Sequence, residues 1–348
     1  MPIQKFSVSR DDSIYHAWPD LALTRGGKLI CTFTECKSHG DRVNSRIMLA
    51  ESSDRGRTWS QKSPFAAVPP SEGFFDTSRI KRMRDGTLII LGNKCGWRKG
   101  KETVPPDCSV YMWRGNAEGT KWKPPVILPF DGICPDKPAE LSCGRLIISA
   151  HNTDCRTNKL AQYLWYSDDG GKTWSERITL ASDARYNLCE VSILEMPDET
   201  LVAFMREESG LGIDCLKVIS RDRGLTWSEV YNVPIPACHR PVAGFLNDGT
   251  VMLTHRYMQG GKGWLGWWTQ NVFAAFMDAE SAAAAGRKEQ SVRIMPIDYD
   301  RSPQSDLGYT GWVQFADGEI YVVTYIVDDA PKAQIRGYSF NMSDVKLG

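Results

Sequence analysis

The sequence predicts an all-β fold, a six-bladed β-propeller, and three observations point to it. Two short apolar runs joined by a turn form a unit that recurs six times along the 348 residues. An element of the form Ser-x-Asp-x-Gly-x-Thr-Trp follows several of these units. The chain also has 12 tryptophans and 30 glycines, spread among many short β-rich runs. A repeat roughly every 50 to 70 residues indicates a closed array in which each unit covers the next.

The recurring unit has the pattern of a tight β-hairpin. The six hairpins begin near residues 17, 78, 137, 189, 240 and 309. Three of their turns contain Asp-Gly, at Asp85-Gly86, Asp248-Gly249 and Asp317-Gly318. Glycine permits the positive backbone angles that such turns need. Residues 1–348 are therefore predicted to form a single propeller domain.

The second repeated element is predicted to be structural. Full copies lie at residues 52–59, 167–174 and 220–227, and a weaker copy is Asn116–Trp122. Serine and aspartate side chains bond neighbouring backbone amides in turns, and tryptophan fills apolar space between units. These residues are expected to build the repeat and not to perform catalysis.

Three further segments complete the plan. Residues 5–9 alternate like a strand and are expected to complete the last sheet beside strands near residues 335–340. Residues 46–51 are predicted to form the third strand of the first sheet. Residues 278–285 could form a short helix that stops at Gly286. The Gly-rich and Trp-rich stretch 260–268 either shapes a binding site or decorates the surface.

Composition limits the possible partners. The formal net charge is zero and there is no basic run, so nucleic acid is an unlikely partner. No apolar stretch has the length of a membrane span. The first ten residues lack the apolar core of a secretory signal, so a cytoplasmic protein is expected, although a secreted protein trimmed of its signal would read the same.

The ten cysteines show no Cys-x-x-Cys spacing. Four of them lie within or beside apolar runs, namely Cys31, Cys143, Cys189 and Cys215. Buried reduced thiols are therefore expected.

Polar residues gather where the hairpins begin and end. If every hairpin turn lies at one face, these positions meet at the other, and all five histidines of the chain are among them. Such a concentration favours a ligand site, whereas any single histidine could simply bond a backbone carbonyl. The set includes His255, but no metal-binding spacing is present, so no metal or other cofactor is expected.

The boxes and hairpins together resemble the sialidase (neuraminidase) superfamily, the six-bladed propellers with BNR or Asp-box repeats. This resemblance implies a glycosidase. In the family a Glu opens the fourth hairpin and an Arg closes it, which Glu190 and Arg206 match, and Tyr309 matches the Tyr that opens the sixth. By resemblance, Tyr309 is the nucleophile and Glu190 is the base. A phenol of pKa about 10 needs such a base at neutral pH.

A third catalytic group should protonate the leaving oxygen, and Asp41 in the loop after the first hairpin is expected to do so. The expected substrate-binding residues are Arg206, His16, Glu35, His39, Arg79, Lys137, His151, His239, Arg240, Arg256 and Asp306.

Two departures from the family pattern concern arginines that grip a sugar carboxylate. Ala17-Trp18-Pro19 stands where sialidases have Arg-Ile-Pro, and residues 267–273 lack the arginine expected on the fifth unit. Sialic acid remains a candidate if Arg240, Arg256 or Lys137 substitutes. A planar guanidinium fork binds carboxylate in a way that other cations do not reproduce.

The expected function is therefore an exo-acting glycoside hydrolase that removes a terminal sugar from a glycan, either sialic acid or another sugar, acidic ones included. Two alternatives stay open: a propeller-type polysaccharide lyase acting on a uronate-containing glycan, and a propeller that binds glycan without turnover.

Overall fold

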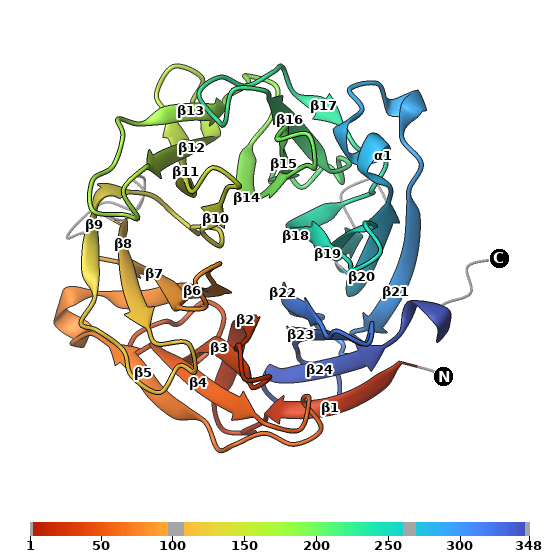
Figure 1. The fold of residues 1–348 in the computed structure, drawn as a ribbon. Coiled ribbons are helices and arrows are strands. Elements are labelled where there is room, and N and C mark those ends of the chain that lie inside the picture. The colour runs from red at the N-terminus through yellow and green to blue at the C-terminus, as the bar shows by residue number, and fades with distance from the viewer. Residues whose placement is uncertain (1–2, 97–107, 260–268, 345–348) are drawn as a thin grey trace. The chain divides into compact units, whose positions relative to one another are not determined.

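The computed structural model describes residues 3–96, 108–259 and 269–344 (Figure 1). These residues form six four-stranded antiparallel sheets, with one short α-helix. The sheets follow one another along the chain as the six hairpins predict. The fold class, a six-bladed β-propeller, is confirmed.

The chain divides into two compact units, the first made of residues 1–135 and 300–348. Unit 1 holds three sheets. Two of them follow the chain in order. They are β2 (Tyr15–Leu23), β3 (Leu29–Cys36), β4 (Arg46–Ser52) and β5 (Ser63–Ala67), then β6 (Phe74–Arg82), β7 (Leu88–Cys95), β8 (Cys108–Gly115) and β9 (Val126–Asp131).

The third sheet of unit 1 joins the two ends of the chain. It contains β22 (Leu307–Gln314), β23 (Ile320–Ile326), β24 (Gln334–Phe340) and, at its edge, β1 (Gln4–Ser9). Strand β1 pairs with β24 in antiparallel register, with Phe6 opposite Gly337. The prediction that the N-terminal strand completes the last sheet is confirmed. Closure in this way leaves neither end strand unpaired on its own.

Unit 2, residues 136–299, also holds three sheets. They are β10 (Ala139–Glu140), β11 (Leu146–Asp154), β12 (Lys159–Ser167) and β13 (Ile178–Ala181); β14 (Leu188–Glu195), β15 (Leu201–Glu207), β16 (Leu216–Ser220) and β17 (Tyr231–Asn232); and β18 (Cys238–Phe245), β19 (Val251–Gln259), β20 (Thr269–Met277) and β21 (Arg293–Tyr299). That residues 1–348 form a single domain stays a prediction.

The fifth sheet has a helix where other sheets have a box. Helix α1 (Ala279–Ala283) lies between β20 and β21, and the Asp278 side chain caps it by accepting a hydrogen bond from the Ser281 amide. An aspartate at this position satisfies an amide that the helix leaves unpaired. The predicted helix is confirmed. The segment 260–268, expected to shape a site or decorate the surface, lies outside the described residues.

The box turns form the hydrogen bonds predicted for them. In the first copy, the Asp54 carboxylate accepts from the Thr58 amide at 2.9 Å and the Ser52 hydroxyl accepts from the Gly56 amide at 2.8 Å. Gly56 has φ +84°, and a Cβ there would meet the Tyr321 ring at 2.2 Å. Only glycine fits such a position without strain.

The boxes lie beside the hairpin turns. In unit 1 the Arg55 guanidinium bonds Asp317, in the turn between β22 and β23, at 2.6 Å. In unit 2 Arg223 bonds Glu199, in the turn between β14 and β15, at 3.1 Å. Within each unit the boxes therefore lie at the turn end of these hairpins, away from the ends where the predicted site residues lie.

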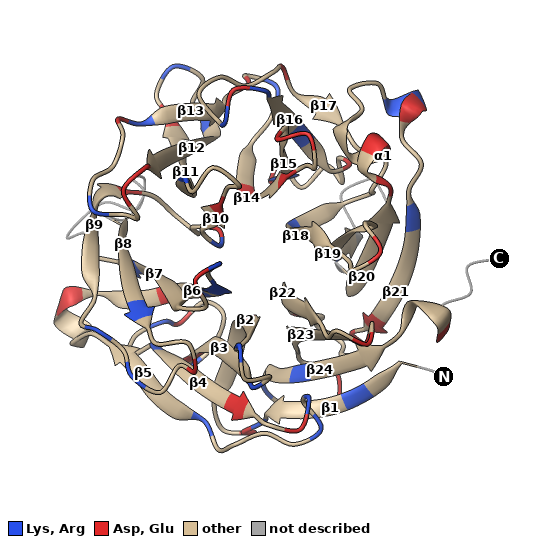
Figure 2. Ribbon diagram, viewed as in Figure 1, with Lys and Arg blue, Asp and Glu red and all other residues tan. Residues whose placement is uncertain are grey.

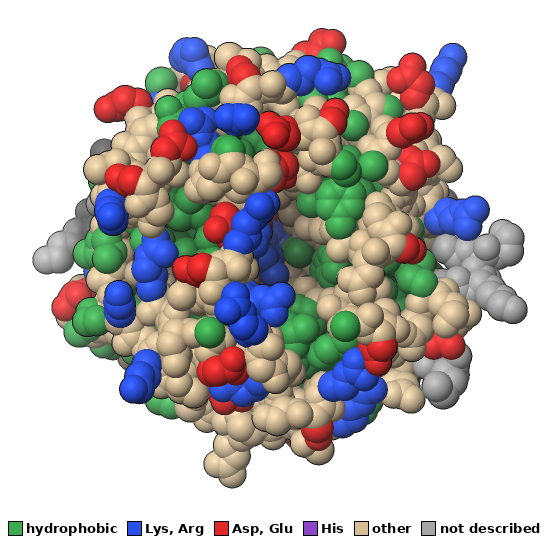
Figure 3. Space-filling model, in the orientation of Figure 1, with side chains coloured by type: hydrophobic (Ala, Val, Ile, Leu, Met, Phe, Trp, Pro, Cys, Tyr) green, Lys and Arg blue, Asp and Glu red, His purple; other side chains and the backbone are tan. Residues whose placement is uncertain are grey.

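Charged residues lie mainly in turns and at strand ends (Figure 2). On the face shown in Figure 3, basic and acidic side chains are interspersed with hydrophobic ones. Among the described residues, no helix is long and apolar enough to cross a membrane.

Candidate functional site

Five of the six strands that open a hairpin carry a β-bulge at the same register position. In β14, Cys189 pairs with Arg206 and Val191 with Met205, so Glu190 is an extra residue on its strand. The same shift occurs in β2, β6, β18 and β22, at Trp18-Pro19, Asp76-Thr77, Arg240-Pro241 and Tyr309. A bulge bends its strand and re-aims a side chain.

Four of these bulges place a bulky residue in the left-handed backbone region. The φ angles are 53° at Trp18, 50° at Glu190, 51° at Arg240 and 49° at Tyr309. Such conformations are costly for residues other than glycine, and they concentrate at functional sites. Three of the four residues were predicted as site residues from the sequence, and the fourth, Trp18, was not.

In unit 1, Trp18 gathers a group that we call the Trp18 cluster: Trp18, His39, Arg42 and Tyr309. The His39 ring meets the indole edge-on at 5.4 Å between centroids, and the Tyr309 ring does so at 6.5 Å. The Arg42 guanidinium carbon lies 4.3 Å from the centre of the indole. A cation over an aromatic face is attracted by the ring quadrupole. The indole thus contacts an imidazole, a guanidinium and a phenol.

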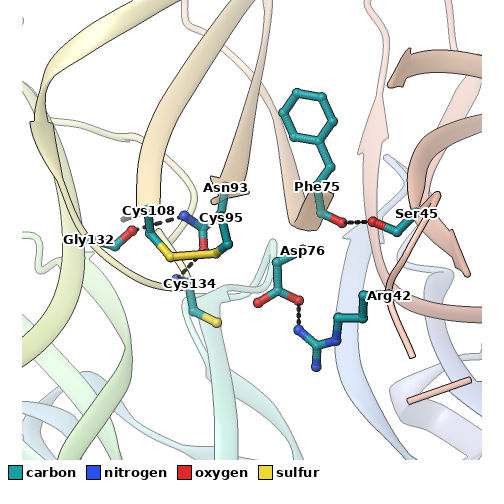
Figure 4. The surroundings of a disulfide bond; sticks show 9 residues. All are labelled: Arg42, Ser45, Phe75, Asp76, Asn93, Cys95, Cys108, Gly132 and Cys134. Carbon is teal, nitrogen blue, oxygen red and sulfur yellow. Dashed lines mark hydrogen bonds and ion pairs between the residues drawn. A yellow bond between two sulfur atoms is a disulfide. The ribbon is translucent and has the colours of Figure 1, made fainter. Parts of the chain in front are cut away.

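Arg42 is held in place from several sides. Its guanidinium is paired with Asp76, the bulge residue of β6 (Figure 4). Its Nε also donates to the His39 carbonyl at 3.2 Å. Burial works against the charge of Arg42, but Asp76, Cys134 and Tyr309 outweigh it and raise the pKa of Arg42. Arg42 therefore remains a fixed cation close to the Tyr309 phenol.

His39 and Asp306 form a hydrogen-bonded pair at the edge of the cluster. His39 Nδ1 lies 3.0 Å from one Asp306 oxygen and 3.2 Å from the other. The Tyr15 hydroxyl donates to Asp306, and the Tyr325 hydroxyl does so at 3.0 Å. Burial opposes ionisation of this carboxyl, but the hydrogen bonds from His39, Tyr15 and Tyr325 leave the pKa of Asp306 lowered.

Cys134 brings a thiol to the Tyr309 hydroxyl, with 4.0 Å between Sγ and Oη. The Asn93 side chain positions the Cys134 loop by accepting from the Cys134 amide at 3.1 Å and donating to the Gly132 carbonyl at 2.9 Å. Figure 4 shows this loop beside a disulfide.

That disulfide joins Cys95 and Cys108, whose Cα atoms lie 4.3 Å apart at facing positions of β7 and β8. The expectation of reduced thiols is therefore wrong for this pair. Eight cysteines are free, and two of them, Cys143 and Cys155, are exposed. Cys143 is thus not the buried thiol that its apolar neighbours suggested.

Asp41, the expected proton donor, points to a different partner. Its carboxylate pairs with Lys37 at 3.1 Å, and its side chain is 36% exposed. The hydrogen bond from Lys37 lowers the pKa of Asp41. Within the described part of the chain, no contact joins the Asp41 side chain to the Trp18 cluster, so its predicted role gains no support from its contacts.

His16 and Glu35 lie together in a separate buried network. The Glu35 carboxylate contacts His16 Nε2 at 3.2 Å, and it pairs with both Lys62 and Arg46. Burial raises the pKa of Glu35, but His16, Lys62 and Arg46 outweigh it and lower that pKa to about 2. Both expected ligand residues therefore have protein partners. Lys62 also borders a cavity of about 410 Å³ between β1 and the first box.

Arg79 is likewise buried in unit 1. Its Nε lies 3.5 Å from the Asp20 carboxylate, and its Nη1 donates to the Thr310 carbonyl at 3.3 Å. These contacts tie β6 to β2 and β22. The expected substrate-binding role of Arg79 thus competes with a structural one.

In unit 2, Glu190 and Arg206 form the contact that the hairpin pattern predicts. Arg206 Nη1 donates to the Glu190 carboxylate at 2.8 Å, and Arg206 Nη2 pairs with Glu208. Arg206 thus bridges two carboxylates. Burial raises the pKa of Glu208; Arg206 opposes this and Glu190 adds to it, and the net shift is upward.

Two further arginines and two histidines complete this group, which we call the arginine cluster: Glu190, Arg206, Glu208, His239, Arg240, Arg256 and His151. Arg256 Nη2 contacts His239 Nδ1 at 3.1 Å. Because a guanidinium only donates, Nδ1 must accept, and the ring is neutral with its proton on Nε2.

The histidines of the arginine cluster are kept neutral. Burial lowers the pKa of His151 to about 4; Glu190 opposes this shift, and Arg240 and Arg206 add to it. Burial, Arg206 and Arg256 lower the pKa of His239 well below its ordinary value. Three arginines therefore lie close to buried, neutral histidines: Arg206 and Arg240 act on His151, and Arg206 and Arg256 act on His239. An anion of matching shape would be stabilised there.

Lys137, the remaining predicted residue, is half-buried just before β10. His255 Nδ1 donates to the Arg256 carbonyl at 3.2 Å, and the ring packs edge-on against Phe273. His255 is thus a histidine whose ring bonds a backbone carbonyl, as the alternative to a ligand site expects.

The sequence did not predict Arg42 or Cys134. Arg42 could have been found, because it ends the same loop that supplied His39 and Asp41. Cys134 carries no such signal, since it lies outside the hairpins and boxes that the repeats define.

Comparisons with known proteins relate this chain to a family of repeat proteins. The BNR repeat-like domain matches residues 80–265. No curated protein matches. Among solved structures, a protein of unknown function from Dyadobacter fermentans DSM 18053 is 20% identical, with a TM-score of 0.81, covering 97% of this chain and 99% of that one.

Two sialidase structures show the same fold. The Hadza microbial sialidase Hz136 is 16% identical, with a TM-score of 0.72, covering 98% of this chain and 69% of its own. The intramolecular trans-sialidase from Ruminococcus gnavus is 14% identical, with a TM-score of 0.65, covering 97% and 96%. The sialidase-like propeller fold is thereby confirmed. Since the family match spans more than half of the chain, the protein belongs to the BNR repeat-like domain family.

Proposed function

We propose that the protein is a glycoside hydrolase that removes a terminal acidic sugar from a glycan. The observation that carries this proposal is the arginine cluster, in which Arg206 pairs with Glu190, Arg240 and Arg256 lie close to the same histidines, and those histidines are neutral. A buried group of several arginines suits a carboxylate-bearing ligand, because planar guanidinium groups bind carboxylates in a bidentate manner. The likeness of the fold to sialidases supports the same substrate class.

Tyr309 is the proposed nucleophile. Its backbone is held in a strained bulge, and its hydroxyl lies near the Cys134 thiol and the Arg42 cation. A phenol needs an adjacent base or a positive charge to act as a nucleophile, and Arg42 places a positive charge beside this one. The expected pairing of Tyr309 with Glu190 joins residues of the two units and stays a prediction.

Arg42 also bears on the missing family arginine. The first hairpin has Ala17 where sialidases have an arginine, but Arg42 approaches the adjacent residue, Trp18, from the loop between β3 and β4. We propose that Arg42 supplies positive charge to the ligand in unit 1. Because its position differs from that of the family arginine, the sugar acid need not be a sialic acid.

Digestion of a glycan library, read by mass spectrometry, tests the proposal. Wild type should release a terminal acidic sugar with the mass of water added across the broken bond. Glu190→Gln and Tyr309→Phe should each abolish release while the fold survives. Tyr321→Phe is the matched control, since it removes a buried phenol hydroxyl at the first box, bonded to Gly56 at 2.8 Å.

Other outcomes would contradict the proposal. An unsaturated uronate product, lighter by one water, would indicate a lyase. Sugar binding without product, unchanged in Tyr309→Phe, would indicate a glycan-binding propeller.

A further inference from the structure

We propose that His39, oriented by Asp306, is the acid that protonates the departing sugar oxygen. This inference rests on the proposed function, and it replaces the expected role of Asp41.

Asp306 fixes one nitrogen of the ring. Both Asp306 oxygens lie within 3.2 Å of His39 Nδ1, and the hydroxyls of Tyr15 and Tyr325 each donate to the same carboxylate. A carboxylate that accepts three hydrogen bonds remains ionised. Nδ1 therefore carries a proton, which it donates to Asp306. Protons can then be exchanged only at Nε2, an arrangement that many histidine acid–base catalysts use.

The second nitrogen is available. The His39 side chain is 47% exposed, and Nε2 has no hydrogen-bond partner among the described residues. Exposure distinguishes His39 from the other histidines of the predicted site, because His16, His151 and His239 are buried. His16 Nε2 also contacts Glu35 and Lys62.

The His39 ring also shares a neighbour, Trp18, with the proposed nucleophile Tyr309. His39 and Tyr309 both contact the Trp18 indole edge-on, at 5.4 and 6.5 Å between centroids. Arg42 lies over the same indole and donates to the His39 carbonyl. His39 and Tyr309 therefore belong to the same small group of side chains around Trp18.

Asp41 is a poorer acid at this place. Its carboxylate is paired with Lys37, which stabilises the ionised form and lowers the pKa of Asp41. An acid that is already ionised at neutral pH has no proton to give.

Cleavage of the glycosidic bond takes place in two halves. The proton on His39 Nε2 passes to the glycosidic oxygen as the bond from that oxygen to the anomeric carbon breaks and its electron pair stays on the oxygen. Tyr309 Oη forms the new bond to the anomeric carbon, and the phenol proton leaves to a base. In the second half, neutral His39 takes a proton from water as the water oxygen forms a bond to the anomeric carbon. The bond from that carbon to Tyr309 Oη breaks, and its electron pair stays on Oη, which recovers its proton from the base.

The charged and titratable groups that face His39 set its pH dependence. They are Tyr15 of β2, Asp306 before β22 and Arg42 of its own loop, with Tyr325 of β23 acting through Asp306. The acid role predicts that turnover of the glycan falls as pH rises.

The test compares His39→Gln with Asp41→Asn on two substrates of one sugar. One is the glycan found by library digestion, and the other is the para-nitrophenyl glycoside, whose leaving group needs little protonation. We expect His39→Gln to lose on the order of 10²–10⁴-fold in kcat on the glycan but only a few-fold on the aryl glycoside. In the pH profile of His39→Gln on the glycan, the fall in turnover at high pH should disappear. Asp41→Asn should match wild type on both.

Three results would overturn the inference or its basis. If His39→Gln, shown to be folded by its melting temperature, matches wild type on both substrates, His39 is not the acid. If Asp41→Asn shows the leaving-group-dependent loss instead, Asp41 is the acid. If wild type releases no sugar from the glycan library, the proposed function itself fails, and the acid role fails with it.

Discussion

Trp18 and Tyr309 occupy equivalent bulge positions in β2 and β22, with φ angles of 53° and 49° and rings 6.5 Å apart. The two strands can approach closely because Gly311 faces β2: a Cβ at that position would meet Asp20 Oδ1 at 2.4 Å. The relative positions of Trp18 and Tyr309 are therefore set by the backbones of β2 and β22.

Trp18→Ala should lower both stability and turnover. Trp18 is among the largest fully buried side chains, so truncation is expected to cost roughly 3–5 kcal/mol in the free energy of unfolding. The loss should also release Arg42 and His39 from the indole. Trp18→Phe keeps an aromatic ring and should cost less. Urea unfolding of the two variants measures the difference, and equal losses would show that the ring itself does not matter.

The buried histidines predict a weaker fold in mild acid. Burial lowers the pKa of His151 and of His255 to about 4, and His239 is shifted in the same direction. Below the unfolded-state pKa of about 6.5 the unfolded chain binds protons that the folded chain does not. Stability is therefore full above pH 6.5 and falls toward pH 4, by up to about 1.4 kcal/mol per pH unit for each histidine.

Urea unfolding between pH 7 and pH 4.5 measures this slope. Replacing His255 with Gln removes one of the titrating groups and should reduce the slope, whatever it does to stability at pH 7. A free energy of unfolding that stays flat over this range would contradict neutral buried histidines.

Arg206→Met should destabilise unit 2 strongly. It leaves the carboxylates of Glu190 and Glu208 without the guanidinium that bridges them, and loss of one partner from a buried pair costs roughly 3–5 kcal/mol. Arg206→Lys keeps one charge and should lose less. Adding Glu208→Gln to Arg206→Met should recover part of the stability. If the double variant is no more stable than Arg206→Met, the carboxylates left without Arg206 are not the cause of the lost stability.

The disulfide predicts how many cysteines react with an alkylating reagent before and after reduction. Denatured, unreduced protein should take up eight alkyl groups, because eight cysteines are free, and all ten cysteines should react after reduction. Cys95→Ala with Cys108→Ala should lower stability by about 3 kcal/mol, as expected for a loop of this length. Cys143→Ser, at an exposed free cysteine, is the control. Ten alkyl groups without reduction would contradict the bond.

Repetition in the sequence predicted the architecture because each repeat must bury its apolar face against the next. Glu190 and Arg206 could be paired from their places at the two ends of one hairpin, and their side chains do meet at 2.8 Å. Residue types that recur at fixed spacing carry this kind of information by themselves.

The tertiary structure decided which polar groups share a site and which have other partners. His16 and His39 look alike in the sequence, but one ring is enclosed by Glu35 and Lys62 and the other is half-exposed beside Asp306. Asp306 lies 267 positions from His39, so no local pattern could join them. Sequence spacing determined the hairpins, whereas bulges and contacts between distant strands determined the direction and the charge of each side chain.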